Sequence, residues 1–431
     1  MNFEKFGFHI PNILLPNKKV DYYKWAVVAC DQYTSEPEYW EEVSEIVSNE
    51  PSTFKLMLPE LFLGKSQEEE MIENIRKSMD AYIENGTLIE MPRGCVLVER
   101  EAEGRKRIGL IIATDLESYD YNEGSTTLTR ATEKTVVERI PPRLKIREGA
   151  KIELPHIMIL IDDPEKSIIE PLLNIDGEVV YDTDLMLKGG HVKGTFIPYD
   201  KLDTMYKAME KSYEKAKEKY GDGNVIFQAM GDGNHSLATA KANWEKIKKG
   251  LSEEEIKHHP ARFALCEIEN IHDEGIVFEP IHRVMFGNES IKGREILDKA
   301  IEKLNELNGK AYLNDDVVEG DNVFSIPYIQ GENSGYIIIE NPSTKLEVGT
   351  LTNALDKIIC ENSLVEIDYV HGEESVRKLS SNEENVGFLL PAMDKFMLFP
   401  AVAADGALPR KTFSMGEANE KRYYIECRYI G

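Results

Sequence analysis

A short polar turn between an apolar run and a helical pattern is the feature that most constrains how this chain can fold. The apolar run covers residues 225–229, the turn reads Gly-Asp-Gly-Asn-His-Ser over residues 231–236, and the helical pattern covers residues 237–249. Glycines at a strand-to-helix turn permit positive φ angles and let a ligand approach the backbone closely. The N–H groups at the start of the helix and the positive end of its dipole favour a phosphate. The turn therefore predicts an α/β unit with an anion or nucleotide site.

The side chains of the same turn predict chemistry as well as binding. Asp232 and His235 place an acid and a base beside the backbone amides. The phosphate cradle would be formed by Gly231, Gly233, Asn234 and Ser236. The alternative is a capping turn, in which Asp232 or Asn234 accepts an N–H from the end of the helix. Because short glycine-rich motifs also match by chance, the pattern leaves both interpretations open.

Length, charge and cysteine content narrow the class of protein. A chain of 431 residues is too long for one ordinary core, so we expect two or three domains. The formal net charge of −26 argues against binding to nucleic acid or to anionic membranes, and it suits a cytoplasmic protein. No uncharged apolar run reaches the roughly 18 residues of a membrane span. The five cysteines include no Cys-x-x-Cys pair, which predicts neither a disulfide framework nor a structural zinc site.

The order of apolar and helical patterns predicts an α/β fold with mixed sheets. Strands are expected at residues 25–30, 95–98, 108–113, 152–161, 225–229, 323–329 and 335–340, and helices at residues 37–46, 67–85, 199–220, 237–249, 289–307 and 351–362. The runs at 262–271 and 276–286 read as a pair of strands. We place the domain boundary after residue 286, so that residues 1–286 form the core with the turn and residues 287–431 form a C-terminal α+β domain.

A basic cluster stands out against the acidic background. Residues 130–151 contain seven Lys or Arg and three Glu, a local net charge of +4 in a protein of −26. Arg143, Lys145 and Arg147 alternate with two apolar residues, so on a strand the three cations would share one face. Together with Arg139, such a face suits a polyphosphate. The alternative is a solvated strand edge, where Lys and Arg discourage aggregation.

Two carboxylates follow the first apolar run. Asp31 ends the run at 25–30, and Glu36 lies five residues further on. The ends of strands are where α/β proteins build their sites, so either carboxylate is a candidate general base. The alternative is a turn that leads into the helix expected at 37–46.

Three segments together resemble one family. They are Glu138-Arg139-Ile140-Pro141-Pro142-Arg143, Asp232-Gly233-Asn234-His235 and Glu279-Pro280-Ile281-His282-Arg283, and they are similar to the bacterial and archaeal domain of unknown function 1015. Its usual turn, Asp-Gly-His-His-Arg, resembles the phosphate-binding turn of the ParB/sulfiredoxin-like group, which includes serine kinases. Here Asn234 and Ser236 replace a His and the Arg. The resemblance therefore requires Arg139, Arg143, Lys145 or Arg147 to supply the phosphate clamp.

The resemblance implies a ParB/sulfiredoxin-like core and a phosphotransferase that uses ATP or ADP with Mg²⁺ on a small hydroxyl substrate, free serine first. In this hypothesis Asp232 holds Mg²⁺, His235 contacts the transferred phosphoryl group, and Asp31 or Glu36 accepts the hydroxyl proton. The alternatives are a nucleotide-sensing module without catalysis and, against the net charge, a nuclease. The oligomeric state stays open.

Overall fold

The computed structural model describes residues 1–122, 124–362 and 364–431, which divide into two compact units. Unit 1 contains Met1–Val277, Phe396–Ala407 and Met415–Gly431, and unit 2 contains Phe278–Lys395 and Leu408–Ser414. The sequence expectation placed the boundary after residue 286 and gave all that follows to one domain. The division falls earlier because β14 (Phe278–Phe286) pairs inside unit 2, and the chain later returns to unit 1.

Unit 1 is built on one large sheet with the strand order β10-β11-β4-β5-β13-β9-β12-β7-β6. Its longer strands are β4 (Leu88–Ala102), β5 (Arg105–Asp115), β9 (Met158–Ile161), β10 (Glu178–Leu185), β11 (Gly190–Pro198), β12 (Gln228–Asp232) and β13 (Phe263–Asn270). The shorter ones are β1 (Phe8–His9), β2 (Asn12–Pro16), β6 (Tyr119–Asp120) and β7 (Thr129–Arg130). Neighbours are antiparallel from β10 to β13, but β13 pairs parallel with β9 and β12 pairs parallel with β7. The α/β class with mixed sheets is therefore confirmed.

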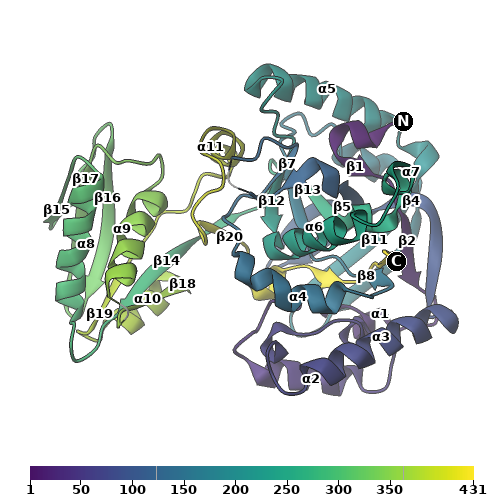
Figure 1. Ribbon diagram of the computed structural model, residues 1–431, viewed down its shortest axis with the longest axis horizontal. Helices are drawn as coiled ribbons and strands as arrows, with labels where there is room; N and C mark the ends of the chain where they lie inside the picture. The colour runs from purple at the N-terminus through teal and green to yellow at the C-terminus, as the bar shows by residue number, and fades with distance from the viewer. Residues whose placement is uncertain (123, 363) are drawn as a thin grey trace. The chain divides into compact units, whose positions relative to one another are not determined.

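The sheet of unit 1 is buried on both faces, which explains its runs of consecutive apolar residues. Along β4, Val96 and Val98 pack into one core cluster while Cys95 and Leu97 pack into the other. The helices of unit 1 are α1 (Tyr22–Trp25), α2 (Pro37–Val47), α3 (Glu68–Glu84), α4 (Ile140–Arg147), α5 (Asp203–Tyr220), α6 (Asn234–Lys248), α7 (Glu253–His258) and α11 (Leu398–Asp405). Helices α2 and α3 cover the first face, whereas α5 and α6 cover the second (Figure 1).

Two expectations about local structure were wrong. The basic segment around Arg143 is the helix α4 and not a strand, because Pro141 and Pro142 occupy its first turn, where their fixed φ angles suit a helix start. The runs at 262–271 and 276–286 do form strands, but they are not partners. Strand β13 pairs with β5 and β9 in unit 1, while β14 pairs with strands of unit 2.

Unit 2 has its own antiparallel sheet with the order β15-β17-β16-β19-β14-β18. The strands not yet given are β15 (Lys310–Asn314), β16 (Val323–Gln330), β17 (Asn333–Glu340), β18 (Glu366–His371), β19 (Asn385–Phe388) and β20 (Phe413–Met415). Helices α8 (Gly293–Leu307) and α9 (Glu347–Glu361) pack on the face that carries Met285. Helix α10 (Glu373–Ser380) packs on the opposite face, against Val284. His282 Nδ1 accepts the Leu390 N–H at 3.0 Å, a structural bond inside this unit.

The last residues of the chain are held in unit 1 by two short strand pairs and a buried ion cluster. Strand β21 (Tyr423–Tyr424) pairs with β3 (Val27–Val28), and β22 (Arg428–Tyr429) pairs with β8 (Ile152–Glu153). Between them the buried guanidinium of Arg422 donates to the carboxylates of Glu267 and Glu426 and, at 3.0 Å, to the carbonyl of Pro155. This cluster fixes the tail against β13.

Removing the Arg422 side chain should strongly destabilise unit 1. We expect Arg422→Ala to lower the free energy of unfolding by about 3–5 kcal/mol, because two buried carboxylates would lose their cation. The three tryptophans of the chain all lie in unit 1, so tryptophan fluorescence in a urea titration follows that unit. Lys193→Ala, which breaks the more exposed Lys193–Glu99 pair, serves as control and should cost below about 1 kcal/mol. Equal losses in both variants would contradict a structural role for the Arg422 cluster.

Candidate functional site

The predicted turn joins β12 to α6. Strand β12 ends at Asp232, Gly233 has a φ angle of 76°, and α6 begins at Asn234. A Cβ atom on Gly233 would lie 3.0 Å from the Ile157 Cα atom and 3.3 Å from His156 Cδ2. Glycine is therefore required here both by the left-handed backbone and by close packing against the segment that carries His156. A larger residue at 233 would displace that segment, so it could not test phosphate binding alone.

The polar side chains of the turn do not cap α6. Asp232 accepts the Gly233 N–H at 2.8 Å and pairs with Lys421 Nζ at 2.9 Å. Asn234 donates its amide to the Glu133 carbonyl and to Thr135 Oγ1, each at 3.2 Å. The capping alternative is therefore not what the structure has. The Ser236 N–H already donates to the Gly233 carbonyl at 3.0 Å, so two of the amides predicted to cradle phosphate, those of Gly233 and Ser236, have partners within the turn.

His156 links the first turn of α6 to the C-terminal tail. The Ser236 hydroxyl lies 2.8 Å from His156 Nε2, and the Tyr424 hydroxyl lies 2.7 Å from His156 Nδ1. Tyr424 also donates to Cys30 Sγ at 3.2 Å. When the Tyr424 proton goes to Cys30, the tyrosine oxygen accepts the Nδ1 proton of His156 and leaves Nε2 as an acceptor for the Ser236 O–H. Burial raises the pKa of Tyr424 well above its usual range, so the phenol stays protonated.

Asp31 belongs to the same group of residues, and Glu36 does not. Asp31 Oδ2 lies 3.8 Å from His156 Nε2, the nitrogen that also contacts Ser236. Glu36 precedes α2 with its side chain exposed, and it is absent from the described residues that line the cavity beside His156. His235 takes a third position, where its Nε2 atom accepts the Val136 N–H at 3.4 Å. Of the two predicted carboxylates, only Asp31 lies at this histidine.

A cavity of about 130 Å³ opens beside His156 and Ser236. Arg143, Arg147 and Tyr424 also line it, and most of the remaining wall is apolar. Its volume is close to that of an engineered cavity that binds benzene, roughly 150 Å³. The cavity therefore suits a small metabolite or one part of a larger ligand.

The cations of α4 are paired with carboxylates. Arg143 pairs with Glu60, Arg147 with Glu153, and Lys145, at 3.3 Å, with Glu68. Arg139 is exposed, and its carbonyl accepts from the Arg143 guanidinium at 2.8 Å. Burial raises the pKa of Glu60 above its usual value, and the nearby Asp31 adds to this while Arg143 opposes it. An anion that reaches Arg143 would therefore meet a carboxyl group that gives up its charge more readily than usual.

Asp232 does not fit the predicted Mg²⁺ site. Burial alone would raise the pKa of its carboxyl, but Lys421 and the Gly233 N–H outweigh burial and hold this pKa below its usual value. The carboxylate thus already has a cation and a backbone donor. Within the part of the chain that the structure describes, no group of three or more His, Cys, Asp or Glu side chains could hold a metal ion. We derive no step through a metal at Asp232.

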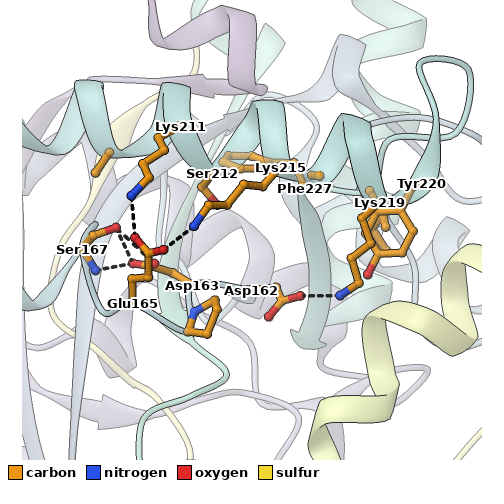
Figure 2. Close-up of a pocket in the computed structure, with 14 residues that line it drawn as sticks. Asp162, Asp163, Glu165, Ser167, Lys211, Ser212, Lys215, Lys219, Tyr220 and Phe227 are labelled. Carbon is orange, nitrogen blue, oxygen red and sulfur yellow. Dashed lines mark hydrogen bonds and ion pairs between the residues drawn. The ribbon is translucent and has the colours of Figure 1, made fainter.

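A second cavity, of about 170 Å³, lies between α5 and residues 162–167. Figure 2 shows three lysines of α5 on one side of it, with Lys211 donating to Glu165 at 2.8 Å and Lys219 donating to Asp162 at 3.1 Å. Lys215 also donates to Glu165, and the bonds from Lys211 and Lys215 lower the pKa of that carboxyl to about 2. The lysine charges are therefore met by carboxylates of the protein itself.

The fold and the site define a mixed α/β protein whose strand–turn–helix motif meets a histidine and a returning tail. The chain matches the family described as protein of unknown function (DUF1015) over residues 14–389, and it belongs to that family. No curated protein matches it. None of the helices in residues 1–122, 124–362 and 364–431 has the length and apolarity needed to cross a membrane.

Solved structures with a related fold include two that we compare by coverage. A free serine kinase in complex with AMP has 12% identity and a TM-score of 0.40, covering 73% of this chain and 90% of its own. A conserved hypothetical protein from Pyrococcus furiosus has 13% identity and a TM-score of 0.38, covering 73% and 94%. These similarities are too weak to transfer a ligand or an activity to this chain.

The sequence patterns missed His156 and Tyr424. His156 follows Leu154-Pro155 without a motif, and Tyr424 lies in a strand-rich tail 268 positions away. No local signal pairs them, since their contact arises from tertiary structure. For α4 a usable signal did exist, because Arg139, Arg143 and Arg147 are four residues apart and follow a helix-type start at Pro141.

The Asp232–Lys421 pair should make unit 1 sensitive to acid. The pKa of Asp232 is lower in the folded chain than in the unfolded chain, so its carboxylate stabilises the fold fully above the unfolded value. This contribution is lost as the pH falls through the folded pKa. We expect the stability advantage of wild type over Asp232→Asn to be constant down to about pH 5 and to shrink between about pH 5 and pH 2.

Urea titrations followed by tryptophan fluorescence at each pH would measure this difference. Asp222→Asn is the control, because the Asp222 side chain is 84% exposed and should show little difference at any pH. An advantage for the Asp232 carboxylate that persists unchanged to pH 2 would mean that Lys421 does not stabilise the charged form.

Proposed function

We propose that the protein is a nucleotide-dependent phosphotransferase that acts on a small hydroxyl substrate, with Asp31 as the general base. The observation that carries this proposal is that Asp31 Oδ2 and the Ser236 hydroxyl of the β12–α6 turn meet at one atom, His156 Nε2. These residues come from distant parts of the chain and converge at a strand end, where α/β proteins place their sites.

The cavity supports a small acceptor. A hydroxyl compound in the space of about 130 Å³ beside His156 would have a carboxylate at its edge and a turn suited to phosphate next to it. Free serine is the first acceptor to test, because the ParB/sulfiredoxin-like group that the turn resembles includes serine kinases. Phosphoryl transfer asks the protein mainly to position its reactants and to neutralise charge.

Arg143 is the proposed phosphate contact in place of the missing motif arginine. It lines the same cavity as Ser236, and the raised pKa of its partner Glu60 favours release of the guanidinium to a stronger anion. Arg147 is a weaker candidate because Arg428 and Arg147 overcome the burial of Glu153 and hold the pKa of that carboxyl below its usual value. Lys145 and Arg139 are exposed.

The proposal is tested with the full chain, ATP or ADP, Mg²⁺ and serine or another small hydroxyl compound. Nucleotide binding is measured first by thermal shift, since roughly 2.7 kcal/mol of stabilisation is expected at a hundredfold excess over Kd. Acceptor-dependent nucleotide consumption is then compared between variants. We expect Asp31→Asn to lower kcat by about 10²–10⁴-fold with little change in nucleotide affinity, because loss of a general base affects the chemical step.

Glu36→Gln is the matched control, since this carboxylate is close in sequence but exposed at the start of α2. It should leave kcat within about twofold of the wild-type value. An Asp31→Asn protein that binds nucleotide and turns over at the wild-type rate would refute the assignment of the base. Binding without turnover for any acceptor would favour the alternative of a nucleotide-sensing module.

A further inference from the structure

We infer that the protein phosphorylates itself on Ser236 when a nucleoside triphosphate is bound and no acceptor is present. This inference rests on the proposed function and assigns a modification site to the same turn. Its basis is the bond between Ser236 and a histidine that is itself held in place. A serine hydroxyl is a weak nucleophile unless a base within hydrogen-bond distance takes its proton, and a third group commonly orients that base.

All three groups are present in unit 1. Ser236 Oγ lies 2.8 Å from His156 Nε2, and Tyr424 holds the other ring nitrogen at 2.7 Å. Tyr424 is itself fixed, because its oxygen accepts the Cys30 N–H at 3.3 Å and its proton is within reach of Cys30 Sγ. The tautomer that this arrangement allows leaves Nε2 free to accept the serine proton.

The surroundings favour the charges that form in the reaction. When His156 takes the proton it becomes a cation, and Asp31 Oδ2 lies 3.8 Å from the protonated nitrogen. Ser236 lies in the first turn of α6, where a phosphate dianion interacts favourably with the helix dipole. The cavity beside it, of about 130 Å³ and lined also by Arg143, leaves space for a phosphoryl group.

The transfer step balances as follows in atoms and charge. Ser236 Oγ forms a bond to the terminal phosphorus of the nucleotide while the bond from that phosphorus to the bridging oxygen breaks. The nucleoside diphosphate leaves with the bridging oxygen and its electron pair, and the serine proton moves to His156 Nε2 and then to solvent. Phosphoserine is the product, and no oxidant or reductant takes part.

The test uses the full chain with ATP labelled in its terminal phosphate, Mg²⁺ and no acceptor. Trypsin releases residues 220–241 as one peptide in which Ser236 is the single serine, so fragment masses separate it from Thr239 and Tyr220. We expect label on Ser236 in wild type and none on this peptide in Ser236→Ala. Ser78→Ala, on the surface of α3, is the matched control and should be labelled like wild type.

The role of His156 has its own readout. His156→Ala should slow labelling by about 10²–10⁴-fold, and added imidazole should restore part of the rate by occupying the space of the lost ring. Tyr424→Phe keeps the ring but loses the hydroxyl that orients His156, so it should slow labelling less than His156→Ala does. Labelling of Ser236 at the wild-type rate in His156→Ala would overturn the inference that this histidine is the base.

Failure of this inference differs from failure of the proposed function. If Asp31-dependent consumption of ATP with an acceptor proceeds while Ser236 stays unlabelled, self-phosphorylation is refuted and the phosphotransferase stands. If the chain neither binds nor consumes nucleotide, both are refuted.

Discussion

The buried guanidinium of Arg422 is the interaction on which the candidate site depends. A charge removed from water is tolerated only where matching charges and acceptors surround it, and here Glu267, Glu426 and the Pro155 carbonyl do so. These partners lie on different segments, so the tail can meet the sheet in one register only. Arg422 is flanked by Lys421, which holds Asp232, and by β21, whose Tyr424 holds His156.

The acidic composition of the chain has a local expression around the cavity. Arg143 and Arg147 have glutamate partners, so in the free protein their charges are neutralised inside the fold. An anionic ligand would therefore bind by exchange, displacing a carboxylate rather than filling an empty positive site. The raised pKa of Glu60 makes its pair with Arg143 easier to exchange than the pair between Arg147 and Glu153, where the pKa is lowered.

Local chemistry made much of the fold predictable, and tertiary contacts account for what was missed. The hairpin of β4 and β5 follows from apolar runs that flank a turn, where Glu103 and Gly104 have φ angles of 49° and 71° as a two-residue hairpin turn requires. Helix α2 follows from Pro37 at its first turn. For α4, the alternation of charged and apolar residues was given more weight than the proline signal, and the strand prediction was wrong.

The site was predictable in one half only. The glycine turn is visible because its backbone requirement is local, whereas His156 and Tyr424 carry no pattern and meet Ser236 through the packing of distant strands. Pairing also differs from adjacency in sequence, as β13 and β14 show. They follow each other along the chain, yet hydrogen bonding to other strands places them in different sheets.

The return of the chain to unit 1 after unit 2 has a consequence for protein synthesis. The ribosome makes Asp31, His156 and Ser236 long before Lys421, Arg422 and Tyr424, with all of Phe278–Lys395 in between. Until the tail emerges, β3 and β8 lack their partner strands, and Glu267 lacks its cation. A nascent chain therefore carries the glycine turn without the residues that orient His156, and the site is assembled only in the last stage of folding.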